Sequence, residues 1–412
     1  MDSRTRAPWR PVLEAEAAAR ARRTAGDIAA AIACAPGELG YDLADGAAGV
    51  ALLFGYLARA DGDPDHRAHA AALLEHAGDR LAELPTTASL FHGFPGVAWA
   101  ADHLRGVFGE ADLELGDDVD AALRSRLAGP LAHADGFDLV TGLVGVGVYA
   151  LERRGRPDAE RCAELVIARL AELARVEPTG ISFWTAPVHL PPQTRAAWPA
   201  GYHDFGLAHG VPGVVALLAR ATALGGAAGA TARELLDGSV GWLLAQRGDG
   251  DTAFPACAAS DGRRSAARSG WCYGDAAVAL ALVRASSAGD PAWADAGVAL
   301  ARHAAARPIG ETGVRDATLC HGAAALAHIY QRLAHATGDP ALTAAARAWL
   351  ARIDDYRVDH PALSASAGFF RATRADPVAD RGLLNGAAGI ALVLLAACST
   401  IAPDWDRALL LG

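Results

Sequence analysis

The sequence contains no lysine. All 37 basic residues are therefore arginines, and 47 acidic residues outnumber them to give a formal net charge of −10. A phosphate-binding P-loop needs a lysine after its glycine-rich turn, so this class of nucleotide site is excluded. The arginines are scattered singly or in short groups rather than gathered into a basic stripe. Nucleic acid is therefore not expected to be the main partner.

Aromatic residues are also scarce, at 6% of the chain, whereas about a quarter of the residues are alanine and 45 are glycine. Alanine is the best helix former and a poor strand residue, so this composition favours an all-α fold. The chain shows no low-complexity repeat, which excludes a collagen-like or disordered protein.

An apolar signal segment is missing from the N-terminus, where Asp2, Arg4 and Arg6 already carry charge. We therefore expect a cytoplasmic location. One stretch, 382–403, is uncharged over a length that can span a bilayer. It contains Asn385 and several glycines, and it ends a series of similar segments. It therefore predicts a buried helix in a soluble core, and we do not expect an integral membrane protein.

One short pattern occurs seven times: a polar residue, a glycine, two further residues and a small residue, followed by a run that is apolar on nearly all sides. The leading glycines are Gly46, Gly93, Gly142, Gly210, Gly274, Gly322 and Gly386. The apolar runs alternate with amphipathic, charged segments such as 157–176, as expected for inner and outer helices. All seven apolar runs are about equally apolar, and the first and last copies show no polar capping face. We therefore predict that seven inner and seven outer helices close into one α/α toroid over residues 1–412, rather than an open solenoid.

In such a ring, all inner helices begin at one end, and their backbone N–H groups make that mouth the natural active site. The three longest intervals between copies contain the loop segments 178–206, 246–270 and 354–381. Loops of this length in a compact domain are typical of lids and binding surfaces. In the first loop we expect short strands around Ile181 and Val188.

Six cysteines are thinly spread over the chain, which disfavours a disulfide framework. Cys34, Cys162 and Cys398 lie in alanine-rich helical stretches and are predicted to be small core residues. The context of Cys257 is ambiguous. The remaining two cysteines have a special place in the repeat.

Cys272 and Cys320 occupy the same position relative to the leading glycines of two consecutive copies, and His321 follows Cys320. If neighbouring inner helices stand side by side, these three residues converge at the mouth. A Cys2His set leaves the fourth position of a zinc ion open, as in catalytic sites. The alternative is two buried cysteines and a helix-capping histidine, and the shared register favours zinc.

These motifs, W-C-x-G at 271–274 and C-H-G at 320–322, resemble those that hold zinc in the lanthionine synthetase C-like (LanC-like) cyclases. The resemblance covers essentially the whole chain, because that family is an α/α toroid with seven glycine-rich inner-helix openings. It implies an enzyme that adds cysteine thiols to dehydroalanine or dehydrobutyrine residues of a precursor peptide and closes (methyl)lanthionine thioether rings, as in lantibiotic biosynthesis. One zinc ion per chain would keep the substrate thiol as a thiolate.

The resemblance also implies roles for four further residues. His209, in an A-H-G-x-P-G motif, would transfer the proton, and Asp138 would be its partner. Arg268 and Tyr273 would contact the substrate carbonyl or enolate. The residues alone leave alternatives: His92 lies in nearly the same motif as His209, Asp138 could be a helix cap, and Arg268 could be a solvated loop residue.

Other functions remain open from the sequence. One is a LanC-like zinc protein that binds glutathione or a partner protein without cyclase activity. Another is an α/α-toroid glycosidase or terpene-type cyclase, but the repeat openings lack an acidic pair or an aspartate-rich motif. His203 and Asp204 either line the mouth or cap a helix. We expect a stand-alone cyclase that acts on a dehydrated precursor peptide, with a separate dehydratase and an exporter as candidate partners.

Overall fold

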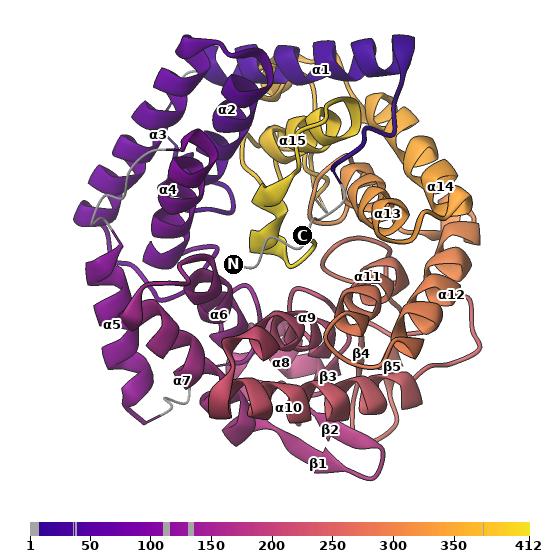
Figure 1. The fold of residues 1–412 in the computed structure, drawn as a ribbon. Helices are drawn as coiled ribbons and strands as arrows, with labels where there is room; N and C mark the ends of the chain where they lie inside the picture. The colour runs from indigo at the N-terminus through magenta and orange to yellow at the C-terminus, as the bar shows by residue number, and fades with distance from the viewer. Residues whose placement is uncertain (1–7, 36, 38, 110–115, 131–135, 374) are drawn as a thin grey trace.

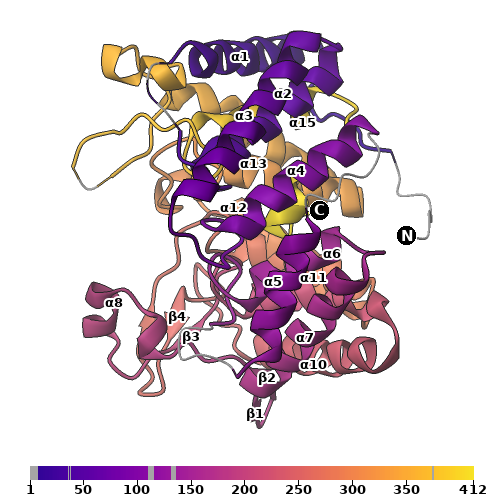
Figure 2. The same cartoon turned by 90° about the vertical axis from the view of Figure 1, so that its left-hand side faces the viewer.

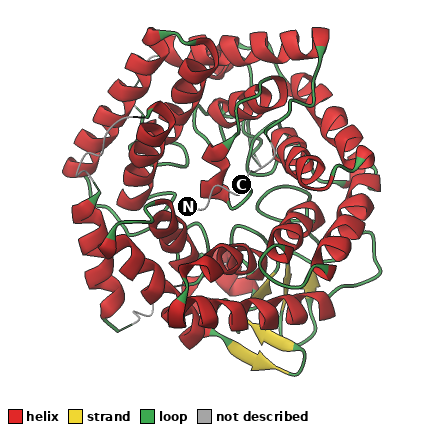
Figure 3. Cartoon of the chain, in the orientation of Figure 1, coloured by secondary structure: helices red, strands yellow, loops and turns green. Residues whose placement is uncertain are grey.

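The computed structural model describes residues 8–412 except 36, 38, 110–115, 131–135 and 374, so Asp2, Arg4 and Arg6 lie outside the described residues. Within the described chain, an inner and an outer ring of helices surround one centre (Figures 1 and 3). The inner helices are α2 (Ala47–Asp61), α4 (Phe94–Phe108), α6 (Leu143–Glu152), α9 (Val211–Ala221), α11 (Asp275–Ser286), α13 (Ala323–Thr337) and α15 (Ala387–Cys398). The outer helices are α1 (Ala15–Cys34), α3 (Pro64–Glu83), α5 (Asp117–Ala128), α7 (Pro157–Leu173), α10 (Gly226–Ala245), α12 (Ala292–Ala306) and α14 (Pro340–Ala351). The predicted double ring of seven inner and seven outer helices is confirmed.

The glycines of the repeat explain how the inner helices pack so tightly. Each inner helix begins directly after the leading glycine of its copy, which is the N-cap residue in all seven cases. The small residue of the pattern is a second glycine in five copies, and in four of these it faces a leucine of the preceding copy around the ring. A Cβ atom at Gly96 would lie 2.9 Å from the Cβ of Leu43, and one at Gly145 would lie 2.9 Å from the Cβ of Leu90. The same Cβ atoms would lie still closer to the carbonyl oxygens of Leu90 and Leu139, in the turns that precede the two helices. A side chain at either position would therefore disrupt its own turn and force neighbouring inner helices apart.

Backbone hydrogen bonds join the turns that precede the inner helices. They run from Leu43 N to Phe91 O (3.1 Å), Phe91 N to Val140 O (3.5 Å), Leu139 N to Ala208 O (3.0 Å), Cys272 N to Cys320 O (3.2 Å), Cys320 N to Leu384 O (2.8 Å) and Leu384 N to Ala44 O (2.9 Å). The last of these bonds links the seventh copy to the first. The inner-helix N-termini are thereby held together at one mouth.

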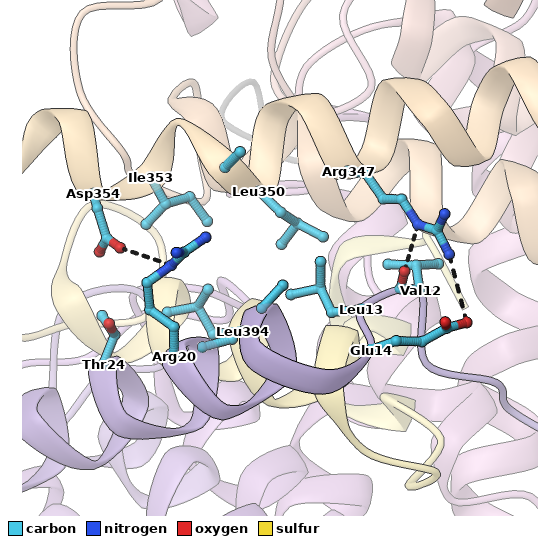
Figure 4. A pocket seen from close by; sticks show the side chains of 13 residues that line it. Val12, Leu13, Glu14, Arg20, Thr24, Arg347, Leu350, Ile353, Asp354 and Leu394 are labelled. Atoms are coloured by element: carbon cyan, nitrogen blue, oxygen red, sulfur yellow. Dashed lines mark hydrogen bonds and ion pairs between the residues drawn. The ribbon is translucent and has the colours of Figure 1, made fainter.

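The ring closes where the first outer helix, α1, packs on the last inner helix, α15. The Trp9 indole N–H donates to the carbonyl of Ala396 at 2.8 Å beside this seam. A cavity of about 330 Å³ lies between α1 and α14 (Figure 4). Apolar side chains such as Leu350 line it, and the ion pairs Arg20–Asp354 (3.9 Å) and Arg347–Glu14 (3.8 Å) lie at its edges. Its lining residues belong to the seam and not to the mouth.

A C-terminal 3-10 helix, η6 (Asp404–Leu409), lies inside the ring of inner helices (Figure 1). Asp406 is fully buried there, 2.7 Å from His328 Nε2 and bonded to both the Nε and the Nη2 of Arg332. Burial opposes its charge, but Arg332 and His328 hold the pKa of Asp406 well below its usual value. The Trp271 indole N–H donates to the carbonyl of Leu409 at 2.9 Å, so this segment also supports the residue before Cys272.

The long loops carry short elements. A hairpin of β1 (Arg175–Glu177) and β2 (Gly180–Ser182) confirms the strand expected at Ile181, but Val188 lies in the 3-10 helix η1 (Pro187–His189), so a strand there was wrong. The strands β3 (His203–Asp204), β4 (Cys257–Ala258) and β5 (Arg264–Ser265) form an antiparallel sheet that joins the first two loops. The remaining elements are α8 (Pro192–Ala197), η2 (Thr222–Leu224), η3 (Ile309–Glu311), η4 (Ile353–Tyr356) and η5 (Pro361–Ser366). Figure 2 shows α8, β3, β4 and the loop after α14 on one side of the ring.

The predictions for the apolar stretch and for most cysteines also hold. Every residue of α15 is buried, as predicted for 382–403, and within the described ranges no helix is both long and apolar enough to cross a membrane. All six cysteines are free, and Cys162 and Cys398 are buried as predicted. Cys34 is exposed, so its assignment to the core was wrong. It is the last residue of α1, two positions after Ile32, the last buried residue of that helix.

Candidate metal centre

The turns before α11 and α13 bring Cys272, Cys320 and His321 together. The Cys272 N–H donates to the Cys320 carbonyl, which fixes the two turns side by side. Gly274 has a φ of +111°, a region that favours glycine, and this lets the chain turn sharply from Cys272 into α11. One potential ligand atom from each of the three residues lies within 4.8 Å of the other two. The geometry therefore allows the three side chains to bind one metal ion.

The chemistry of this cluster fits zinc. Cys272 is buried and Cys320 is half-buried, and the His321 side chain is 17% exposed. The Cys320 thiol holds the pKa of Cys272 well below its usual value, helped by His321 and Arg268 against the effect of burial. His321 Nδ1 is buried without a hydrogen-bond partner among the described residues. Two thiols and a free imidazole nitrogen are a zinc donor set with room for one further ligand.

Arg268 reaches this cluster from the loop before α11. Its Nη2 donates to Cys272 Sγ at 3.4 Å. The residue as a whole is exposed, as expected of a loop arginine, yet its guanidinium lies against the sulfur. A cation at this point is able to stabilise negative charge that develops on a group bound beside Cys272.

His209 and Asp138 form a pair across the third and fourth copies, with His209 Nδ1 at 3.6 Å from Asp138 Oδ2. Asp138 also accepts a hydrogen bond from the Thr141 N–H at 2.6 Å, so it stabilises the turn before α6 as well. Burial opposes the imidazolium, but the contact with Asp138 outweighs it and raises the pKa of His209 to about 9. The histidine is therefore cationic at neutral pH and able to donate a proton.

The partner of Tyr273 is Asp204, a residue for which the sequence left two roles open, at the mouth or as a helix cap. The Tyr273 hydroxyl donates to Asp204 Oδ2 at 2.9 Å and joins the fifth copy to the fourth. Asp204 is buried, and burial raises its pKa to about 6. The ring centroids of Tyr273 and His209 are 6.2 Å apart, so Tyr273, which directly follows Cys272 in the chain, lies next to His209. His203, in contrast, packs edge-on against tryptophan rings and lies outside the cluster.

The sequence model of the lanthionine synthetase C-like protein family matches residues 37–410. This chain belongs to that family. Fourteen chains of solved structures also match. One of them is named nisin cyclase; it has a TM-score of 0.75 and 20% identity to this LanC-like chain, and the match covers 95% of this chain and 97% of the other. The likeness supports the double-ring fold. Among curated proteins, none matches the sequence.

This LanC-like protein contains a second histidine–aspartate pair. His92 Nδ1 lies 3.8 Å from Asp42 Oδ2, and Asp42 accepts a hydrogen bond from the Asp45 N–H at 2.9 Å. The contact repeats that of His209 with Asp138 almost atom for atom, so pair geometry does not distinguish the two histidines. The neighbourhood does, because Tyr273, which packs near His209, directly follows Cys272.

Sequence reasoning missed Asp316, which lies 3.7 Å from His321 through its Oδ2 and His321 Nε2. The signal was in the repeat. An aspartate stands six residues before the leading glycine in three copies, as Asp204, Asp316 and Asp380. In each, Oδ1 accepts the N–H of the residue two positions on, at 2.8, 3.0 and 2.9 Å respectively. The pattern therefore marks a turn, and the position of Asp316 next to a potential ligand becomes visible only in three dimensions.

Proposed function

We propose that this LanC-like protein is a zinc-dependent peptide cyclase. It would add cysteine thiols to dehydroalanine or dehydrobutyrine residues of a dehydrated precursor peptide and form lanthionine or methyllanthionine rings. One observation carries the proposal: in a chain of this family, the potential ligand atoms of Cys272, Cys320 and His321 lie close enough together to bind one metal ion. Arg268 and the His209–Asp138 pair lie around the same mouth.

The metal would be held by the two sulfurs and His321. Bound zinc supplies a Lewis acid that keeps the substrate thiol deprotonated at neutral pH. His321 Nε2 faces Asp316, so Nδ1 is the nitrogen left for the metal. With three protein ligands, a zinc ion held there would have one further ligand position for the thiol of the peptide.

The remaining residues would supply the proton for the α-carbon and stabilise the negative charge of the enolate. The thiol loses its proton, a bond forms between sulfur and the β-carbon, and the electron pair of the double bond moves to the carbonyl oxygen as an enolate. The α-carbon then takes a proton from His209, and His209 regains one from solvent, which balances the proton that the thiol released to solvent, so the addition has no net by-product. His209 is the donor, because Asp138 keeps it cationic at neutral pH.

Arg268 is placed to stabilise the enolate oxygen, because its guanidinium already lies at Cys272 Sγ, beside the bound thiolate. The Tyr273 hydroxyl already donates its proton to Asp204. We therefore assign Tyr273 a structural role at the mouth, beside His209 and Cys272. We further propose that the protein works in the cytoplasm, with a separate dehydratase that supplies the substrate and an exporter as partners.

The test uses the purified full chain and the dehydrated form of a precursor peptide encoded beside its gene. We expect about one zinc per chain, and loss of the peptide's free thiols without change of mass, because the addition is an isomerisation. A protein that binds zinc but closes no ring would instead be the LanC-like binding protein for glutathione or a partner. A protein that binds no zinc would refute both functions.

A further inference from the structure

We propose that Asp316 positions His321 for the metal. It would hold the imidazole in the tautomer and orientation that present Nδ1 to the zinc. The inference rests on the metal site of the proposed function. It adds a residue that does not touch the metal and acts through His321.

The comparison of three equivalent aspartates separates this role from turn formation. Asp204, Asp316 and Asp380 use Oδ1 in the same way, as acceptor for the N–H two residues on. They differ in what the second oxygen meets. In Asp204 it accepts the Tyr273 hydroxyl, and in Asp380 it lies 3.7 Å from Arg371 Nη1. In Asp316 it lies 3.7 Å from His321 Nε2.

The two imidazole nitrogens have separate environments. Nε2 faces a fully buried carboxylate, which favours the tautomer that carries the proton on Nε2. Nδ1 is buried and has no hydrogen-bond partner within the described residues. Leaving a buried nitrogen unpaired is costly, and a metal ion restores a partner to it. A carboxylate behind a ligating histidine both orients the ring and makes it a stronger donor.

The carboxylate of Asp316 is itself held firmly. Oδ1 accepts from Thr318 N at 3.0 Å and from Thr318 Oγ1 at 2.8 Å. Oδ2 accepts from Ala372 N at 3.0 Å. Ala372 belongs to the long loop after α14, so that loop reaches the metal centre through Asp316. An aspartate that only formed the turn would not need this second anchor.

The experiment measures zinc affinity by chelator competition on the full chain. Asp316→Asn keeps the side-chain oxygen that accepts Thr318 N and removes the charge behind His321. We expect about 10- to 100-fold weaker zinc binding. Asp380→Asn makes the same change at the same repeat position, away from the metal, and should match the unsubstituted chain within about twofold, because it leaves the support behind His321 intact.

Equal affinity in Asp316→Asn and the unsubstituted chain, or an equal loss in Asp380→Asn, would overturn the inference. If the unsubstituted chain binds no zinc, the proposed function and the role of Asp316 fail together, whereas a chain that binds zinc equally well with and without Asp316→Asn overturns the role of Asp316 alone. A second measurement needs no variant. In the zinc-loaded chain labelled with ¹⁵N-histidine, we expect His321 to carry its proton on Nε2 and to bind through Nδ1. The opposite assignment would also overturn the inference.

Discussion

Replacing Asp138 by asparagine should change the pH dependence of ring closure rather than its rate at every pH. Asparagine keeps an oxygen for the Thr141 N–H and removes the charge that faces His209 Nδ1. Contact with Asp138 raises the pKa of His209 to about 9 from its ordinary 6.5, and burial acts in the opposite direction. Without the charge, the pKa of His209 should fall to about its ordinary value.

The magnitude follows from the fraction of cationic His209, which is lost as the pH rises through the pKa. At about pH 8 this fraction falls from roughly nine-tenths to about 3%, so kcat/KM should drop roughly 30-fold. At about pH 6 both forms are mostly cationic, and the drop should be less than about twofold from this cause. The assay is free-thiol loss from the dehydrated peptide across this range, since kcat/KM reports the free enzyme's ionisations.

The matched control is Asp42→Asn, which makes the same substitution in the similar pair with His92. It should leave the alkaline limit of activity in place. A loss in Asp138→Asn that has the same size at all pH values would refute the role of the charge. A shift in Asp42→Asn with none in Asp138→Asn would assign the acid to His92 instead.

Three further predictions concern the metal and the ring. Cys272→Ala should lose the zinc, measured as metal per chain, because one of three ligands is gone. Trp271→Phe removes the indole donor of the buried Leu409 carbonyl, so urea unfolding should show a loss of about 1–3 kcal/mol. Gly145→Ala places a Cβ against the Leu139 carbonyl of its own turn and against Leu90 of the neighbouring copy, and it should cost about 1–3 kcal/mol in the same assay. Its control is Gly26→Ala in α1, where open space surrounds the new Cβ and the helix should gain about 0.5–1 kcal/mol. An equal effect of the two glycine changes would contradict the packing argument.

Much of the ring could be predicted because its determinants are local and repeated. A leading glycine caps each inner helix, and the second glycine allows close approach, so both leave a fixed spacing in the sequence. The same register placed Cys272 and Cys320 on one level of adjacent helices. Their convergence then needed only the assumption that consecutive copies are neighbours.

The other features of the fold and the site depend on contacts between segments that are distant in the chain, and such contacts produce no repeated pattern in the sequence. Nothing in its own sequence shows that η6 lies inside the ring, because Asp406 contacts His328 and Arg332 only after the ring has formed. The strand expected at Val188 was wrong because Pro187 begins a 3-10 turn there. Asp316 repeats a turn position, and its contact with His321 depends on how the imidazole is oriented.

The seam between α1 and α15 has a consequence for the synthesis of the protein. Trp9 and its acceptor, Ala396, are 387 residues apart in the chain. At an elongation rate of roughly 5–20 residues per second, α1 leaves the ribosome roughly 20–80 s before α15 exists. Throughout that time its apolar face, which includes Ile28 and Ile32, has no native surface to cover it. The apolar face of α1 therefore stays exposed in the nascent chain until α15 has been made. We expect a chaperone to bind this helix and protect it during that time.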